Sequence, residues 1–390
     1  MTKPTIMMIG GGIQQIKAVQ AAQRCGYRVL VSDRSETSPC FEFADFTAVL
    51  DGRNVEELIA YTALHKNELN IQGIFTLTEL VTSVATVATA TGLPGVSVLS
   101  AVSCQNKQLS KQAWLKSGIS TPQGKMVGSK EEATAFLTDL SGKVILKPII
   151  GFGGKGIIKA SSPSDLDQYD FSKGPAIIET HIDGSMHDVN GVFDRQGHFV
   201  PLGCFDRTFA TQNPLETGAV YPSQLLPEQL KQAYALTEHA ARAVGINWGP
   251  VKSDLVLSAD GFMILELAPR LHGPKGTLYL TAMVDGQNHL ERIFDVLTDM
   301  GDVKAPKSDP AQQSVATYEI IEHPGKPFSN VENIDVLSQS GAEILLLNRS
   351  SSTTAYTDNT EVVGYVFGSG DNVKVLKTTL KTVQTKLTFS

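Results

Sequence analysis

The chain has few cysteines and none of the spacings by which cysteines form a redox pair or hold a metal. No Cys-x-x-Cys sequence occurs, and the four cysteines are scattered at Cys25, Cys40, Cys104 and Cys204. We therefore expect free thiols in a reducing compartment, with core packing as their role.

An excess of basic residues and a long apolar run are also missing. The formal net charge is −7, which argues against a general nucleic-acid or membrane-surface binder. No apolar run reaches the roughly 18 residues that a membrane span needs. The first residues, MTKPTIMMIGGG, enter a strand without a signal-peptide cleavage pattern. We expect a cytoplasmic homodimer with no nucleic-acid or membrane partner.

Repeats and low-complexity segments are absent from the sequence. The chain has 390 residues, of which 42% are hydrophobic and 19% charged, and this size predicts two or three domains with a large core. Residues 302–312 are rich in proline and charge and are predicted to be a linker, and the polar run 348–360 a loop.

The first hundred residues alternate between strand and helix patterns. Strands are predicted at 5–9, 28–32 and 73–77, and helices at 14–25, 56–66 and 82–91. This alternation indicates a parallel, doubly wound sheet. Three glycines at residues 10–12 and Asp33 imitate a dinucleotide fingerprint, but its third glycine position is Gln15. The glycines are better explained by a tight strand-to-helix turn.

The middle of the chain carries a glycine-rich loop. Gly151, Gly153 and Gly156 join one predicted strand to another, which is the wrong context for a dinucleotide site. Such a loop can fold over a polyphosphate, with Lys147 and Lys155 supplying positive charge. The alternative is a mobile hairpin with solvated lysines. Further helices are predicted at 105–117, 227–244, 287–300 and 374–386, and strands at 143–148, 156–160, 176–179, 189–193 and 199–205.

Residues 251–273 read as a β-hairpin whose two apolar runs flank Asp260 and Gly261. Asp254 and Glu266 lie within these runs, and Arg270 follows. A buried carboxylate without a partner is costly, so a bound divalent cation would explain the pair. The alternative is an edge hairpin with two solvated acids.

Turn length decides whether the two acids can share a cation. A two-residue loop of Asp260 and Gly261 would place Leu255 opposite Glu266. A three-residue loop that begins at Ala259 places Asp254 opposite Glu266 and suits glycine at its last position. We predict the three-residue loop, with the opposed Cβ atoms roughly 4.5–5.5 Å apart.

Together these residues resemble the ATP-grasp superfamily of carboxylate–amine or carboxylate–thiol ligases, in the branch near biotin carboxylase and the L-amino-acid ligases. The resemblance covers essentially the whole chain and rests on the order of Lys107, LKPIIGFGGKGI, IIETHI and the hairpin. It implies an α/β (α+β overall) ATP-grasp fold with a Rossmann-like domain at 1–100 and a small C-terminal α/β domain at 313–390. The ATP-grasp domain would span 101–305, with a lid subdomain at about 107–178 and a large subdomain at about 179–305.

The resemblance also implies roles for single residues. ATP and Mg²⁺ (or Mn²⁺) would be the cofactors, with Asp254 and Glu266 as metal ligands and Arg270 holding the reacting carboxylate. Lys107 and Lys147 would hold the phosphates and act with Arg270 in catalysis. The loop residues Gly151, Gly153, Gly154, Lys155 and Gly156 would cover the phosphates. Glu179, Thr180, His181 and Ile182 would form a hinge that contacts adenine, and His187 would contact the nucleotide. A structural role for His187 is the alternative.

Two positions depart from the family pattern. Met186 stands where an acid commonly binds the ribose, and Ala268 stands where an asparagine usually helps to hold a second Mg²⁺. The first departure puts the ribose contact in doubt, and the second puts the number of metal ions in doubt.

The activity implied is the formation of an acyl phosphate on a substrate carboxylate, expected to be that of an amino acid, followed by attack of an amine. Candidate substrate contacts are Glu79, Arg207, Glu216, His272 and Gly273, although both glutamates could equally be surface acids. A carboxylase or transformylase of the purine-biosynthesis type is the second reading, and a non-catalytic ATP-binding module is the third.

Overall fold

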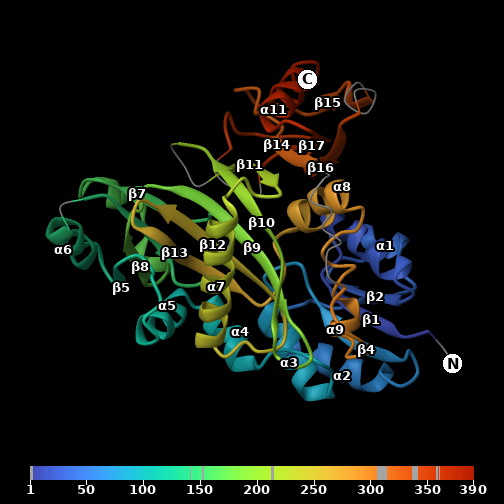
Figure 1. Cartoon of the computed structure of the whole chain (residues 1–390). Helices are drawn as coiled ribbons and strands as arrows, with labels where there is room; N and C mark the ends of the chain where they lie inside the picture. The colour runs from blue at the N-terminus through green and yellow to red at the C-terminus, as the bar shows by residue number, and fades with distance from the viewer. Residues whose placement is uncertain are drawn as a thin grey trace.

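The computed structural model describes residues 3–140, 142–151, 153–211, 215–304, 314–335, 341–356, 359 and 361–390. Most of the predicted linker at 302–312 therefore lies outside the described residues. The leading unit, the lid sheet and a long central sheet are arranged side by side, with the C-terminal segment at the upper end of the central sheet (Figure 1). None of the described helices combines the length and apolar character of a membrane span.

The leading unit confirms the predicted parallel, doubly wound sheet. Its strand order is β3-β2-β1-β4, and every pair is parallel. The strands are β1 (Thr5–Ile9), β2 (Arg28–Asp33), β3 (Phe46–Val49) and β4 (Ile71–Phe75), with helices α1 (Ile16–Arg24), α2 (Val55–His65), α3 (Val81–Thr91) and α4 (Val98–Gln105). The backbone N–H of Gly11 donates to Asp33 Oδ2 at 2.7 Å, so this acid already serves the glycine turn.

The lid is a four-stranded antiparallel sheet in the order β5-β8-β6-β7. Its strands are β5 (Gly124–Val127), β6 (Val144–Pro148), β7 (Ile158–Ala160) and β8 (Ala176–Thr180). Helix α5 (Lys107–Lys116) leads into it, and α6 (Lys130–Leu140) packs on it through Ala133, Phe136 and Leu137. The glycine-rich loop connects β6 to β7, as predicted from the sequence.

The central sheet has eight strands in the order β13-β12-β9-β10-β11-β14-β17-β16. They are β9 (Ser185–Phe193), β10 (Phe199–Phe209), β11 (Glu216–Tyr221), β12 (Gly249–Ser258), β13 (Gly261–Ala268), β14 (Val315–Ile320), β16 (Glu343–Leu346) and β17 (Gly364–Gly370). Helix α7 (Pro227–Ala243) covers β9, β12 and β13, and α11 (Val373–Gln384) covers β14 and β17. Strands β15 (Val331–Glu332) and β18 (Thr388–Phe389) pair separately. The C-terminal strands thus extend the sheet that also carries the predicted metal hairpin.

One predicted helix, 287–300, is wrong over most of its length. Only α9 (Phe294–Leu297) forms there, because the Asn288 side chain accepts from Glu291 N–H and stabilises a local turn instead. Helical structure lies earlier, in a π-helical segment at Lys275–Leu280 followed by α8 (Thr281–Asp285). The π-helical residues are all buried, so they show no amphipathic period that sequence analysis could detect.

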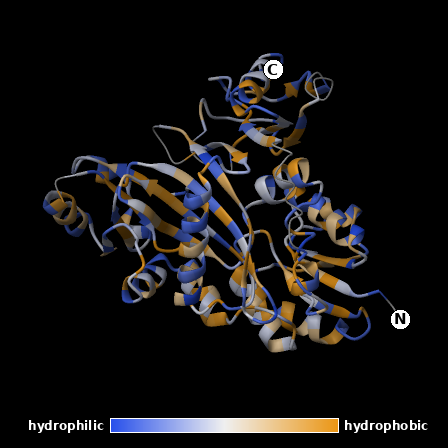
Figure 2. Cartoon of the chain, viewed as in Figure 1, coloured by the Kyte–Doolittle hydropathy of each residue, from blue (hydrophilic) through white to orange (hydrophobic). Residues whose placement is uncertain are grey.

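The cores lie between the sheets and their helices, and hydrophobic strands contrast with the more hydrophilic outer faces of the helices (Figure 2). The largest core cluster joins the leading unit to the central sheet and the C-terminal segment. The four cysteines are free; Cys40, Cys104 and Cys204 are buried and Cys25 is half-buried, which confirms the predicted thiols.

Candidate active site

The hairpin of β12 and β13 brings Asp254 and Glu266 opposite each other, as predicted, but by a different route. The predicted three-residue loop is wrong, because Ser258 pairs with Gly261 and leaves a two-residue turn. Leu255 then pairs with Ile264, and Asp254 pairs with Glu266, so Leu265 is an extra residue. This β-bulge shifts the register by one and restores the pairing that the turn alone would have broken.

Asp254 is surrounded by charges of both signs. Asp188 is its direct neighbour on β9, Lys252 Nζ lies 2.5 Å from Asp254 Oδ1, and Arg207 lies 3.6 Å from Oδ2. Burial and the adjacent Asp188 carboxylate raise the pKa of Asp254 to about 6, against the opposing effect of the two cations. A bound divalent cation would relieve this crowding of carboxylates.

Glu266 has more positively charged surroundings than Asp254. Lys107 Nζ is 3.4 Å from Glu266 Oε1 and also donates to the carbonyl of Gly151 at 3.0 Å. Burial alone would raise the pKa of Glu266, but Lys107, Lys252 and Lys147 outweigh it and lower the pKa to about 2. One lysine therefore joins the hairpin to the start of the glycine-rich loop.

The two facing carboxylates fit a hard cation such as Mg²⁺, which prefers oxygen ligands and keeps several waters. No group of three or more His, Cys, Asp or Glu side chains within the described ranges could hold a metal ion. Ala268 contributes no ligand and pairs across the hairpin with Lys252. The residues present thus suit a cation completed by water or phosphate oxygens rather than an all-protein cage.

A buried ion triad links α5 to the lid sheet. Glu179 on β8 lies 2.8 Å from Lys111 Nζ and 2.5 Å from Lys147 Nζ, with one lysine at each carboxylate oxygen. All three side chains are at most about a tenth exposed. Burial would raise the pKa of Glu179, but the two lysines lower it, so the group is ionised.

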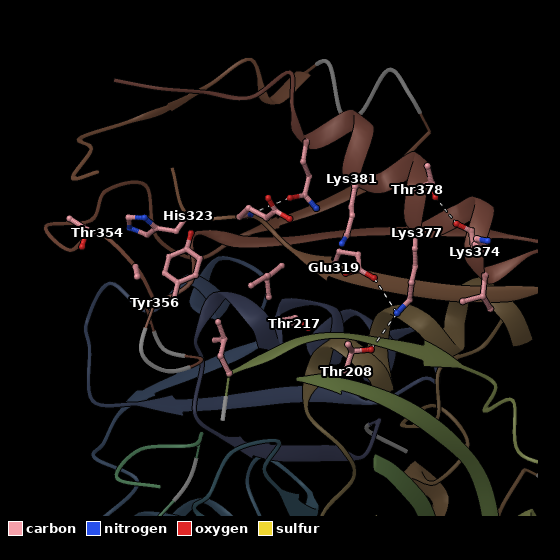
Figure 3. Close-up of a pocket in the computed structure, with 16 residues that line it drawn as sticks. Thr208, Thr217, Glu319, His323, Thr354, Tyr356, Lys374, Lys377, Thr378 and Lys381 are labelled. Carbon is pink, nitrogen blue, oxygen red and sulfur yellow. Dashed lines mark hydrogen bonds and ion pairs between the residues drawn. The ribbon is translucent and has the colours of Figure 1, made fainter. Parts of the chain in front are cut away.

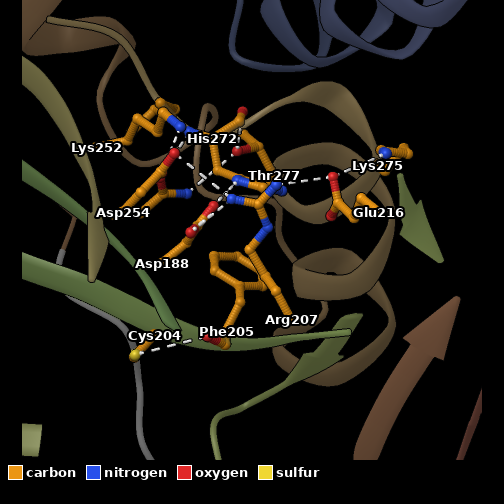
Figure 4. Close-up of polar contacts among 12 residues, drawn as sticks. Asp188, Cys204, Phe205, Arg207, Glu216, Lys252, Asp254, His272, Lys275 and Thr277 are labelled. Carbon is orange, nitrogen blue, oxygen red and sulfur yellow. Dashed lines mark hydrogen bonds and ion pairs between the residues drawn. The ribbon is translucent and has the colours of Figure 1, made fainter. Parts of the chain in front are cut away.

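A second buried network lies beneath Asp254 (Figure 4). Arg207 on β10 reaches between Asp188 and Glu216, with a nitrogen 2.9 Å from each carboxylate. Glu216 also accepts from the Tyr318 hydroxyl and lies 3.4 Å from Lys275 Nζ. The network connects the candidate metal ligand to strands β11 and β14.

Arg270 lies at the boundary between the hairpin and the leading unit. Its Nη2 is 2.5 Å from Glu79 Oε1, and its Nη1 donates to the carbonyl of Leu271. A cavity of about 700 Å³ opens here, lined from the leading unit by Gly10, Asp33, Arg34, Arg53 and Glu79 and from the other side by Gly151, Glu266 and Ala268. Ligands of doubly wound sheets bind at this place, outside the carboxyl ends of the strands.

A family model described as an ATP-grasp domain matches residues 140–277. The chain carries an ATP-grasp domain. The matched region contains both lid lysine Lys147 and the hairpin acids, so the family match and the site geometry coincide.

Known proteins agree with this assignment. The formate-dependent phosphoribosylglycinamide formyltransferase of Prochlorococcus marinus (strain MIT 9313) is 26% identical over 288 residues, which cover 69% of this chain and 70% of that protein. The L-amino acid ligase from Bacillus licheniformis is 18% identical, with a TM-score of 0.83 over 100% of this chain and 99% of that chain. An N5-carboxyaminoimidazole ribonucleotide synthetase solved with ADP is 19% identical, with a TM-score of 0.78 over 98% of each chain. The predicted ATP-grasp fold is confirmed.

Several predicted nucleotide contacts of the ATP-grasp domain are already engaged within the protein. Glu179 is held by two lysines, so its predicted contact with adenine requires one of them to release it. His187 is buried, and its ring nitrogens lie 2.8 Å from Asp206 Oδ1 and 2.7 Å from Ser185 Oγ. This satisfied environment favours the structural alternative for His187.

The predicted hinge and the glycine-rich loop carry the other predicted nucleotide contacts. Thr180 ends β8, and His181 and Ile182 follow it. The backbone N–H groups of Thr180 and His181 donate to the carbonyls of Gln123 and Lys143. Gly153, Gly154 and Gly156 have φ of +66°, +81° and +71°, which side chains rarely adopt. Lys155 is exposed at the tip. Their predicted contacts with phosphate and adenine stay predictions.

The predicted substrate residues divide into two groups. Glu79 lines the cavity beside Arg270, as the prediction requires. Arg207 and Glu216 bind each other in the inner network, so the prediction that either contacts substrate directly is not supported, and Glu216 is not a surface acid. His272 is buried, with Nδ1 2.6 Å from Asp188, and neither it nor Gly273 lines the cavity.

Sequence analysis missed Lys252, Asp188 and Lys111 as members of the site. Lys252 lies two residues before Asp254, so the two-residue period of a strand would have placed both on one face. Lys111 lies one helical turn after Lys107. Asp188 had no comparable signal, because its contact with Asp254 depends on the pairing of β9 with β12.

Proposed function

We propose that the chain is an ATP-dependent ligase that activates the carboxylate of an amino acid as an acyl phosphate, which an amine then attacks. The observation that carries this proposal is the contact between Arg270 and Glu79, the second of which lines the cavity. An amino acid bears a carboxylate and an ammonium group, which complement these two side chains. Its carboxylate would replace Glu79 on Arg270, and its ammonium would bind the released Glu79.

ATP supplies the phosphoryl group, and Mg²⁺ neutralises the charge on its phosphates. Asp254 and Glu266 would hold the metal, and Lys107 and Lys147 would bind the leaving polyphosphate. The γ-phosphoryl group would pass to a carboxylate oxygen, releasing ADP. Attack of the amine on the carbonyl carbon would then release phosphate. Arg270 would stabilise the negative charge on the tetrahedral centre, and the glycine-rich loop would exclude water from the acyl phosphate.

A ribonucleotide-using carboxylase or formyltransferase is the second candidate. Arg34 and Arg53 line the same cavity and could hold the phosphate of a ribonucleotide. The curated relative from Prochlorococcus marinus, a phosphoribosylglycinamide formyltransferase, favours this reading as well.

ADP release separates the two candidates. The purified chain would be tested with pairs from a panel of amino acids, and with glycinamide or aminoimidazole ribotides plus formate or bicarbonate. We expect ADP release with particular amino acids, and its loss in Glu79→Ala. Release driven only by ribotides, and lost in Arg34→Ala and Arg53→Ala, would establish the second candidate instead.

A further inference from the structure

A second cavity, of about 870 Å³, lies between the central sheet and helix α11 (Figure 3). Its walls come from the ends of β10, β11 and β14, from the segment after β14, and from the face of α11 that bears Lys374, Lys377 and Lys381. None of the residues proposed to bind ATP, Mg²⁺ or the amino acid lines it.

This cavity lies on the opposite face of the sheet from the inner network of the active site. Successive residues in a strand point to opposite faces. Thr208, Thr217 and Glu319 line the cavity, whereas their preceding neighbours Arg207, Glu216 and Tyr318 form the network. A ligand here would therefore be separated from the network by one layer of backbone.

The cavity wall carries more positive than negative charge. Lys374, Lys377 and Lys381 occur at i, i+3 and i+7 and so share one face of α11. Lys377 is paired with Glu319, with Nζ 3.4 Å from Oε1, and also donates to Thr208. Neither Lys374 nor Lys381 has an ion-pair partner among the residues that the structure describes. Two cations are thus available at the mouth, opposed by Glu322.

A buried donor also lacks a partner at this cavity. Gln384 is 9% exposed, and its Oε1 accepts from the backbone N–H of Glu322. Its Nε2 has no hydrogen-bond partner within the described part of the chain. Buried polar groups are nearly always hydrogen-bonded, so an unpaired amide at a cavity wall indicates an acceptor supplied by a ligand or water.

We propose that this cavity is a binding site for a small dianion, either a dicarboxylate or a phosphate monoester. Lys374 and Lys381 bind its negative groups, and the Gln384 amide donates to one of its oxygens. Lys377 neutralises Glu319 and so keeps that carboxylate from repelling the ligand. Glu319 and Glu322 disfavour long polyanions, which could not avoid both carboxylates.

Isothermal titration calorimetry at low, constant ionic strength tests the proposal. Glutarate and glycerol 3-phosphate would be the probes, so that the two arms distinguish a dicarboxylate from a phosphate monoester. We expect one of them to bind, and the Lys374→Ala/Lys381→Ala double variant to weaken that binding by about tenfold or more. Gln384→Leu should weaken it as well.

Two controls separate this site from the proposed active site. Lys386→Ala removes an exposed lysine just beyond α11 that does not line the cavity, and Arg270→Ala disturbs the active site. Both should bind the probe as the native chain does. ADP release by the double lysine variant should be unchanged, which shows that it is folded. Failure of both probes to bind, or equal binding by the double variant, overturns the proposal.

Discussion

Asp254 and Glu266 face each other across the hairpin, yet their electrostatic surroundings differ. Burial and Asp188 raise the pKa of Asp254, whereas Lys107 and its neighbouring lysines hold that of Glu266 low. Glu266 is therefore the permanent anion of the pair. A divalent cation bound here would depend on the charge of Glu266, and on the facing geometry that the bulge creates.

Replacing Glu266 with Gln should reduce Mg·ATP-dependent turnover by about a hundredfold or more, because the metal loses a charged ligand while side-chain shape is kept. ADP release at a series of Mg²⁺ concentrations measures the effect. Glu228→Gln, an exposed acid on α7, is the matched control and should have no effect. Full turnover in Glu266→Gln would show that the metal ligands lie elsewhere and that the hairpin acids are structural.

His289 provides a pH dependence of stability away from the metal ligands. It is fully buried between Asn190 and Tyr221, with Asp285 at 3.7 Å and Arg292 and His272 nearby. Burial lowers the pKa of His289 to about 3, against about 6.5 in an unfolded chain. Between these two pKa values, His289 is therefore protonated in the unfolded state but not in the folded state. Stability due to this group is complete above pH 6.5 and falls as the pH decreases.

Urea unfolding at pH 7.5 and pH 5 tests this prediction. The loss from His289 between pH 6.5 and pH 5 should be about 2 kcal/mol, since one pH unit corresponds to about 1.4 kcal/mol. His289→Asn should lower stability at both pH values but lose less between them than the native chain does. An equal loss of stability in both proteins would mean that the pKa of His289 is not lowered in the folded chain.

The individual residues of the site differ in how visible they are in the sequence. Asp254 and Glu266 were found because acids inside apolar strands violate the expected pattern, and Arg270 because it follows them closely in the sequence. Glu79 was named because it follows a strand of the leading sheet; it lines the cavity, and its contact with substrate stays a prediction. Arg207 was assigned to substrate, since only the pairing of β10 with β9 and β11 reveals its carboxylate partners.

At the scale of elements, the lid is attached to α5 by a buried ion triad. Lys111 and Lys147 share Glu179, and Lys111 also donates to Thr121 and to the carbonyl of Pro122. Lys111→Met should destabilise the chain by about 3 kcal/mol, because the buried Glu179 carboxylate then keeps only one of its two lysine partners.

Denaturant unfolding of Lys111→Met measures this cost. Lys130→Met is the control, because Lys130 forms an exposed pair with Asp167 in the same subdomain and should cost less than about 1 kcal/mol. Equal small effects of both substitutions would indicate that water or Lys147 alone compensates the Glu179 carboxylate.

Elements with a clear periodicity were predicted well, and the errors have physical causes. Helix α7 and helix α11 are amphipathic and lie within a residue or two of their predicted bounds. The π-helical residues 275–280 are buried on all sides and gave no period. The bulge at Leu265 had no local signal, since a leucine in an apolar strand fits a regular and a bulged ladder equally well.

The largest difference from the sequence interpretation concerns the whole molecule. A separate C-terminal domain was expected at 313–390, and its boundaries stay a prediction. Strand β14 nevertheless pairs with β11, and β17 and β16 continue the same sheet. Such pairing between distant segments cannot be read from the periodicity of either one, because periodicity reports the face of a strand and not its neighbour.

A continuous sheet predicts that the C-terminal segment and the ATP-grasp domain unfold together. Phe367 on β17 is fully buried and stacks on Tyr279, with their ring centroids 4.5 Å apart. Phe367→Ala should cost about 3–5 kcal/mol, because it leaves a cavity between β17 and the π-helical segment of the ATP-grasp domain. The two tryptophans, Trp114 and Trp248, both lie outside residues 313–390. Their fluorescence therefore reports unfolding of the remainder of the chain.

In urea, the midpoint reported by tryptophan fluorescence should fall in Phe367→Ala by as much as the midpoint reported by circular dichroism. Val375→Ala on the outer face of α11, where Val375 is 64% exposed, should leave both midpoints unchanged. If only the midpoint reported by circular dichroism fell, the C-terminal segment would unfold independently. The pairing of β11 with β14 would then be too weak to couple this segment to the rest of the chain. Coincident shifts would mean that β11 and β14, which contribute Glu216 and Tyr318 to the inner network, unfold as one unit. The C-terminal segment would then be needed to hold Glu216, and through it Arg207, in place beneath Asp254.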